Sequence, residues 1–143
     1  MNRRIIFDTS TLVSAALRPE SVPRKALIEA FARWDLCLSP ETLAELDRVL
    51  SGGKFDRYLS RTERRQFVAL IRRHAQHFNV EPQLLATLRP PCRDPQDNKL
   101  LALALAAEAT VIVSSDEDLL VLHPWNGIPV FKPREFLARY SGQ

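Results

Sequence analysis

Short apolar segments alternate with longer amphipathic ones along this chain, and this alternation restricts its fold more than any other feature. The apolar runs have the length and composition of buried strands; they lie at 3–7, 35–38, 110–115 and near Val130. Helical patterns separate them, at 9–17, from Pro23, at 40–50, at 61–78, from Gln96 and from Pro133. Strands that alternate with helices predict an α/β domain with a mainly parallel sheet.

The length and composition fit one globular domain over 1–143. The chain has 143 residues, of which 45% are hydrophobic and 26% charged, close to the average for folded domains. No apolar run approaches the ~18–20 residues that span a bilayer. Asp8 interrupts the apolar N-terminal stretch, so we expect a cytoplasmic protein without membrane contact. The net charge of +3 is compatible with a nucleic-acid substrate but is weak evidence by itself.

The cysteines and histidines do not suggest a zinc site or a disulfide framework. Cys37 and Cys92 lack metal-site spacing, and Cys37 lies in an apolar run that favours a buried free thiol. His74 shares a helical stripe with Phe67 and is therefore expected to pack against the core. His77 and His123 have no metal-like spacing.

Carboxylates follow two of the predicted strands directly. Asp8 ends the run at 3–7 and Asp116 follows the run at 110–115. Ligands of open α/β sheets bind beyond the carboxyl ends of the strands, so both residues are candidates for a functional site. Each could instead be an N-cap or an Asx-turn residue of the helix that follows.

Two further carboxylates are placed by helical phase. Asp97 lies on the same stripe as the leucines of the helix from Gln96, although it could also serve the helix start together with Asp94. We prefer Asp97 to Asp94 because its phase directs it with the apolar face. Glu45 lies on the rim of the apolar face of 40–50, where a solvated surface glutamate is the alternative.

Four carboxylates at one sheet edge would repel each other unless a cation neutralises them. Mg²⁺ prefers carboxylate and water oxygens and accepts phosphate oxygens, and Mn²⁺ takes the same ligands. Such a site suits phosphodiester hydrolysis, because a bound metal lowers the pKa of water and neutralises charge on the phosphate.

The ordered strings IIFDTSTLVSAAL, SPETLAELDRVL, CRDPQDNKLLALALAAEATVIVSSDEDLL and GIPVFKPREFL resemble the PIN-domain nucleases. The resemblance runs from Ile5 to Leu137 and is greatest to PIN proteins regarded as toxins of toxin–antitoxin systems, related to VapC-like ribonucleases. It implies a three-layer α/β/α sandwich and an acidic Mg²⁺ or Mn²⁺ site.

The resemblance also implies roles for particular residues. The acidic family positions fall on Asp8, Glu45, Asp97 and Asp116, with Asp118 as a further acidic position. Supporting polar positions fall on Thr9, Ser10 and on Ser114 or Ser115. Ser10 stands where the family most often has asparagine.

A basic segment supplies a candidate partner surface. Residues 54–77 hold seven lysines and arginines against two acidic residues. Arg61, Arg65 and Arg72 fall on one face of the helix. Three roles are open for this face: it is solvated, it contacts RNA phosphates, or it contacts a protein partner, either an antitoxin or a second copy in a homodimer.

We therefore expect a metal-dependent endoribonuclease for single-stranded RNA, the toxin of a toxin–antitoxin pair. The alternatives are a PIN-fold RNA-processing nuclease without an antitoxin and a non-catalytic binding module. A Mg²⁺-dependent phosphatase with Asp8 as nucleophile is disfavoured, because Ser10 stands where that chemistry wants a second acid.

Overall fold

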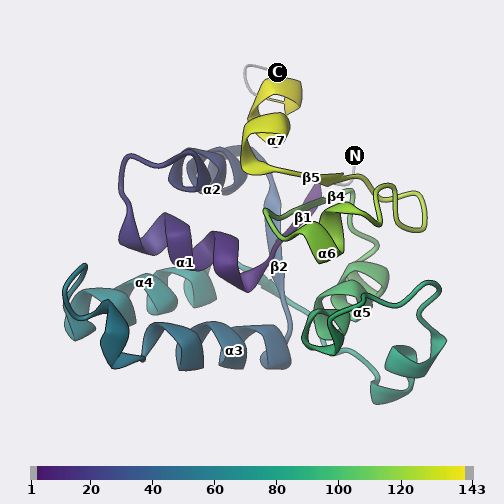
Figure 1. Cartoon of the computed structure of the whole chain (residues 1–143), viewed down its shortest axis with the longest axis horizontal. Coiled ribbons are helices and arrows are strands. Elements are labelled where there is room, and N and C mark those ends of the chain that lie inside the picture. The colour runs from purple at the N-terminus through teal and green to yellow at the C-terminus, as the bar shows by residue number, and fades with distance from the viewer. Residues whose placement is uncertain (1–2, 141–143) are drawn as a thin grey trace.

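Five parallel strands form the centre of the protein. The computed structural model describes residues 3–140. The strands are β1 (Arg4–Phe7), β2 (Asp35–Leu38), β3 (Gln76–His77), β4 (Val111–Val113) and β5 (Val130–Phe131). Their order across the sheet is β3-β2-β1-β4-β5, with β1 in the middle (Figure 1). Ile5 pairs with Leu36 on one side and with Val111 on the other, so the carboxyl ends of all five strands point to the same edge.

Helices connect the strands and cover both faces of the sheet. The α-helices are α1 (Thr9–Leu17), α2 (Val22–Arg33), α3 (Pro40–Leu50), α4 (Arg61–His74), α5 (Asn98–Ala107), α6 (Glu117–Leu120) and α7 (Pro133–Tyr140). Short 3₁₀ turns are η1 (Gly53–Phe55), η2 (Pro82–Thr87) and η3 (Pro95–Asp97). Within residues 3–140, no helix combines the length and apolar character needed to cross a membrane.

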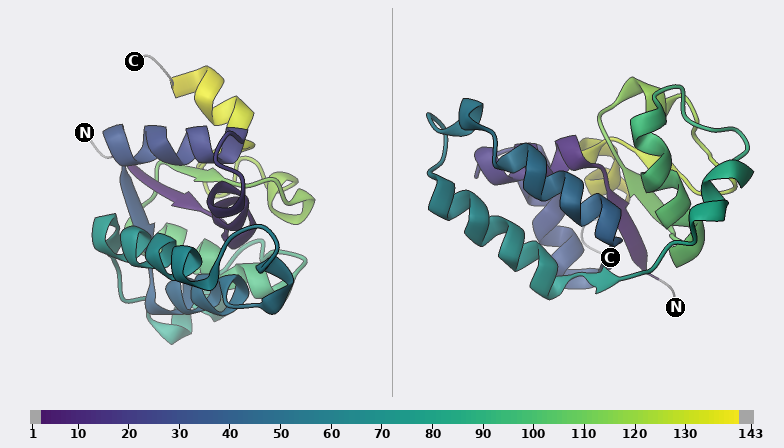
Figure 2. Two further views of the ribbon diagram at one scale, coloured as in Figure 1. Left: turned by 90° about the vertical axis from the view of Figure 1, so that its left-hand side faces the viewer. Right: turned by 90° about the horizontal axis from the view of Figure 1, so that it is seen from below.

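Alternate side chains of β1, β2 and β4 enter two separate cores, as the two-residue period of a strand requires. Ile5 and Phe7 of β1 pack with α1, α2, α3, α4 and α7, whereas Ile6 between them packs with α5 and α6. Figure 2 shows α3 and α4 on one side of β1 and α5 on the other. The predicted fold class, a PIN-like α/β/α sandwich with a parallel sheet, is confirmed.

The prediction of a helix over 61–78 was wrong at its end. Helix α4 stops at His74, because the chain turns extended at Ala75 and then pairs with β2 as β3. The backbone amide of Phe78 donates to the carbonyl of Leu38 at 2.8 Å. Strand pairing has replaced the helical bonds that the sequence pattern would allow here.

The predicted buried stripe on α4 was also misplaced. Val68, Ile71 and Arg64 form the buried face. His74 is exposed, although its ring still lies 5.4 Å from the ring of Phe31. Because helix α4 packs on α3, the direction of that contact, and not the count of apolar residues, decides which stripe is covered.

Arg64 is the unexpected member of this buried face, with 1% of its surface exposed. Its guanidinium donates to the carbonyl of Leu50 at 2.7 Å and of Gly52 at 2.8 Å, and pairs with Asp56. The carbonyls at the end of a helix lack intrahelical partners. Arg64 therefore satisfies the end of α3 and ties it to the turn η1.

Candidate active site

Asp8 lies at the carboxyl end of the central strand and is 4% exposed. Its Oδ1 accepts the backbone amide of Thr11 at 2.9 Å, which makes Asp8 the N-cap of α1. Its Oδ2 accepts a hydrogen bond from the hydroxyl of Ser114. The capping alternative is thus realised, and it fixes the direction of the carboxylate without removing it from the sheet edge.

Asp116 occupies the same place one strand away. Its Oδ1 accepts the amide of Asp118 at 2.9 Å and caps the short helix α6. Its own backbone amide donates to the hydroxyl oxygen of Ser114 at 2.9 Å. Ser114 is fully buried and therefore links Asp8 and Asp116 through a single hydroxyl group.

The sequence left open which of Asp94 and Asp97 caps the helix start and which joins the acidic cluster, and the structure gives each residue one of these roles. The carboxylate of Asp94 caps the turn η3 by accepting the amide of Gln96 at 3.0 Å. The side chain of Asp97 makes no capping bond. It interacts instead with Asp116, and the charges of Asp116, Asp94 and Asp8 all act on it. Asp97 is therefore the one that joins the strand-end carboxylates.

Glu45 reaches this edge from the middle of α3. Its Oε1 accepts the hydroxyl of Thr9, the residue after Asp8, at 2.6 Å. Its Oε2 lies 3.0 Å from the ammonium of Lys99 and 3.8 Å from the guanidinium of Arg48. Glu45 is consequently held beside Asp8 by a hydroxyl group and two cations.

Burial and mutual repulsion raise the pKa values of two of these carboxyls. The pKa of Asp97 rises from its ordinary value of 3.8 to about 7, because the group is partly desolvated and because Asp116 lies beside it. Burial raises the pKa of Asp8 as well, although hydrogen bonds from Ser114 and Thr11 oppose that rise. A cleft that concentrates negative charge in this way attracts cations.

The donor set fits a hard divalent cation that keeps much of its water. All four side chains offer carboxylate oxygens, which Mg²⁺ and Mn²⁺ prefer. Across residues 3–140, no group of three or more His, Cys, Asp and Glu side chains is close enough to enclose an ion directly. Mg²⁺ is commonly held by one or two carboxylates and by several waters, so this spacing suits it.

The supporting positions are placed around this cluster. The hydroxyl of Ser10 lies 3.4 Å from Asp8 Oδ1, at the limit of a hydrogen bond. The carboxylate of Asp118 pairs with Arg93 at 2.5 Å. Of the two candidate serines, Ser114 is the one bonded to Asp8, whereas Ser115 is exposed and lines a pocket next to the cluster.

Several neighbours of the cluster were not anticipated from the sequence. The thiol of Cys92 donates to the carbonyl of Asp118 at 3.4 Å and lies 3.8 Å from Asp97 Oδ2. Burial raises its pKa. Asn98 accepts the amide of Cys92 at 2.8 Å, which anchors the loop before η3. The contact between Lys99 and Glu45 joins two helices far apart in the sequence, so no local pattern signals it.

The basic face of α4 lies away from these carboxylates. Arg61, Arg65 and Arg72 are all exposed, as the helical phase predicted. Cys37 is buried and free, also as predicted, and burial raises the pKa of its thiol to about 11.

Comparison with known proteins identifies the family. Residues 4–118 match the family model described as PIN domain, so the chain belongs to the PIN-domain family. An uncharacterised protein of Methanocaldococcus jannaschii is 26% identical to this chain over 154 residues, covering 96% of this chain and 92% of that protein.

Three solved structures show the same fold at low sequence identity. PAE2754 from Pyrobaculum aerophilum superposes with a TM-score of 0.68, with 16% identity and complete coverage of both chains. VapBC2 from Rickettsia felis, bound to a DNA fragment from its promoter, gives 0.64 at 12% identity, covering 89% of this chain and 96% of that one. VapC20 of Mycobacterium tuberculosis, a toxin that cleaves the sarcin–ricin loop, gives 0.58 at 15% identity, covering 87% and 98%.

Proposed function

We propose that this PIN-domain protein is a Mg²⁺- or Mn²⁺-dependent endoribonuclease for single-stranded RNA and the toxin of a toxin–antitoxin pair. The observation that carries the proposal is the convergence of Asp8, Asp97 and Asp116 at one edge of the sheet, with the pKa of Asp97 raised to about 7. A folded protein that gathers like charges at a cost to its stability is expected to use them. Neutralisation by a divalent cation is the simplest such use.

The residues around the cluster set the orientation of each carboxylate. Ser114 and Thr11 hold Asp8 from two sides, and Thr9 and Lys99 hold Glu45. When bound, a metal ion would supply a water of lowered pKa as nucleophile and would neutralise charge on the phosphate. One or two of Asp8, Asp97 and Asp116 would contact that ion directly, and the remaining carboxylates, Glu45 included, would reach it through its waters. Because the bonds to Ser114 and Thr11 are made before substrate binds, little reorganisation of Asp8 is needed.

The antitoxin partner is supported by the kind of protein that shares this fold. The VapBC2 structure from Rickettsia felis contains a toxin-family protein together with its partner. VapC20 cleaves the sarcin–ricin loop, which is RNA. We carry both properties to this chain as part of the proposal, in which its partners are an RNA substrate and a cognate antitoxin.

The decisive variant is Asp8→Asn. Asparagine is as good an N-cap as aspartate, so the bond to the amide of Thr11 and the fold should persist. We expect cleavage of a fluorescent single-stranded RNA in Mn²⁺ to fall by at least a hundredfold, and EDTA to stop cleavage by the wild type. A chelator that removes zinc but not Mg²⁺ should have no effect.

Asp94→Asn is the matched control, because Asp94 caps η3 and asparagine can keep that bond. It should retain cleavage within a few-fold of wild type. Cleavage by Asp8→Asn at a similar rate would refute the metal-nuclease proposal. Cleavage in the wild type without any co-purifying or inhibitory partner would favour an RNA-processing nuclease without an antitoxin.

A further inference from the structure

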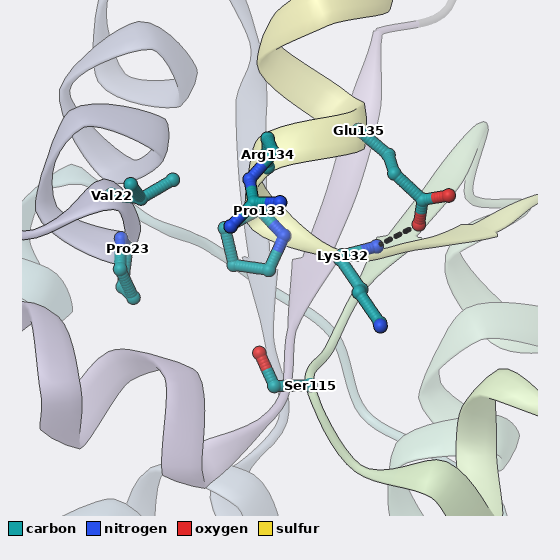
Figure 3. Close-up of a pocket in the computed structure, with 7 residues that line it drawn as sticks. All are labelled: Val22, Pro23, Ser115, Lys132, Pro133, Arg134 and Glu135. Atoms are coloured by element: carbon teal, nitrogen blue, oxygen red, sulfur yellow. Dashed lines mark hydrogen bonds between the residues drawn. The ribbon is translucent and has the colours of Figure 1, made fainter.

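A second polar pocket opens beside the acidic cluster, between the carboxyl ends of β4 and β5 and the start of α2. It has a volume of about 350 Å³, at the lower end of the ~300–1,000 Å³ typical of ligand sites. Its lining residues, drawn in Figure 3, are Val22, Pro23, Ser115, Lys132, Pro133, Arg134 and Glu135. None of them belongs to the four carboxylates discussed above.

The pocket and the acidic cluster share a wall. Ser115 stands between Ser114, which is bonded to Asp8, and Asp116. The backbone amide of Ser114 donates to the carbonyl of Phe131 at 2.9 Å, so the ends of β4 and β5 lie side by side. Lys132 is the first residue after β5. A polymer that occupied the acidic cluster would therefore meet this pocket within one or two of its repeating units.

The charged groups of the pocket favour an anion. Lys132 and Arg134 are exposed, and neither forms an ion pair with a carboxylate within residues 3–140. Among the lining residues the two cations outnumber the one carboxylate, Glu135, whose Oε1 accepts the backbone amide of Lys132 at 2.8 Å (Figure 3). Ser115 adds a hydroxyl donor, and its side chain points up toward Pro133.

The direction of α7 adds to this preference. Pro133 begins the helix, so the positive end of α7 faces the pocket. Proline has no amide hydrogen and the amide of Lys132 is bonded to Glu135, so the amides of Arg134 and Glu135 are the ones without an intrahelical acceptor. Anions bind readily where such amides and cationic side chains meet. The carboxylates of the acidic cluster would repel a phosphate that has no cation close by, and this pocket supplies two cationic side chains, Lys132 and Arg134.

We propose that this pocket, formed by Ser115, Lys132 and Arg134, is a phosphate subsite that holds the RNA backbone next to the scissile bond. The inference rests on the proposed nuclease function and adds to it the path of the substrate. The bound group is an internal phosphodiester, because the pocket is partly open to solvent and the strand can continue beyond it. Contacts to phosphate position a strand without reading its sequence.

The test measures binding of a labelled single-stranded RNA in EDTA, where no cleavage occurs, across a range of salt concentrations. The double variant Lys132→Ala/Arg134→Ala should bind roughly tenfold more weakly at low salt. The log–log salt slope should become shallower by about 1.4, since each lost phosphate contact contributes ~0.7 for a single strand. Both side chains are exposed, so the variant should unfold at the wild-type temperature.

The matched control is Lys54→Ala/Arg57→Ala, which removes the same charge from exposed residues in the connection between α3 and α4. That connection lies at the far left of Figure 1, away from β5 and α7. Lys54 and Arg57 belong to the basic segment 54–77 but lie before α4, outside the face formed by Arg61, Arg65 and Arg72. The control variant should therefore change the affinity less than twofold. A second pair tests the opposite wall: Val22→Glu should weaken RNA binding, whereas the uncharged Val22→Gln should not.

The outcomes separate this inference from the proposed function. Unchanged affinity and salt slope in the double variant, in a wild type that binds and cleaves RNA, would overturn the subsite and leave the nuclease proposal intact. A wild type that does not cleave RNA, combined with weaker binding by the double variant, would refute the nuclease and support only the binding of RNA phosphate at this pocket. Equal losses in the double variant and in the control would also overturn the subsite, because they would show only an effect of net charge. Loss of binding to an acidic protein partner, with RNA affinity unchanged, would overturn it as well.

Discussion

Asp97→Asn is predicted to stabilise the metal-free protein while it removes a carboxylate from the acidic cluster. The pKa of Asp97 is raised from 3.8 to about 7, first by burial and then by Asp116. Between these two values the folded chain binds more protons than the unfolded chain, so the free energy of unfolding falls as the pH rises. The wild type in EDTA should therefore be more stable at pH 5 than at pH 8.

The size of the effect follows from the pKa difference. At about 1.4 kcal/mol per pH unit, the change from 3.8 to about 7 corresponds to at most about 4 kcal/mol. Asp97 is only partly buried, and water screens part of the repulsion, so we expect about 2 kcal/mol. For a chain of this length, that is roughly 8 °C in the midpoint of thermal unfolding. Asparagine carries no charge and should recover this amount at pH 8.

The assay is thermal and urea unfolding of the wild type and Asp97→Asn at pH 5 and pH 8, in EDTA and in Mn²⁺. The variant should exceed the wild type at pH 8 in EDTA and approach it at pH 5. Mn²⁺ should stabilise the wild type at pH 8 and leave the variant nearly unchanged. Asp94→Asn is the control and should follow the wild type closely. A variant that is no more stable than the wild type at pH 8 in EDTA would refute the electrostatic reasoning.

Two further predictions concern α4. Arg64→Ala should lower the free energy of unfolding by about 2–4 kcal/mol in urea titration, because the carbonyls of Leu50 and Gly52 lose a buried donor. The control is Arg65→Ala, at an exposed neighbouring residue, which should change the free energy of unfolding by less than ~0.5 kcal/mol. Equal effects of the two substitutions would contradict the role of Arg64. Replacing Arg61, Arg65 and Arg72 together with alanine should weaken RNA binding about equally across sequences if that face of α4 contacts phosphates. Unchanged RNA binding with weaker antitoxin binding or self-association would assign the face to a protein partner.

The sheet could be predicted because its signals are local. The three central strands each contain a run of three buried apolar residues, and several helices have a side-chain cap, such as Ser39 for α3 and Ser60 for α4. The end of α4 could not be predicted in the same way. The helical pattern continues to Phe78, but pairing of Gln76 with Cys37 of β2 is a contact between residues 39 positions apart.

The residues of the candidate site also separate into those that local sequence signals predict and those that depend on contacts between distant residues. Asp8 was predictable because it directly follows β1, and Asp116 because it lies just past the end of β4. Asp97 was preferred to Asp94 from the phase of a helix predicted from Gln96, although it lies in η3 and α5 begins one residue later. Their proposed roles in metal binding and catalysis stay predictions. Lys99 beside Glu45 was not predictable, because the contact spans 54 positions. The resemblance offered Ser114 or Ser115, and a contact across 106 positions decided for Ser114 beside Asp8.

The sequence by itself determined the order of the strands and helices apart from β3, because caps and two- and 3.6-residue periods act over a few residues. It also determined which carboxylates reach the sheet edge, because parallel strands bring their carboxyl ends together. Only the tertiary structure decided which charges meet there. The raised pKa of Asp97, the burial of Arg64 and the pocket beside Lys132 arise from elements that are distant in the chain and are brought together by burial of the two cores.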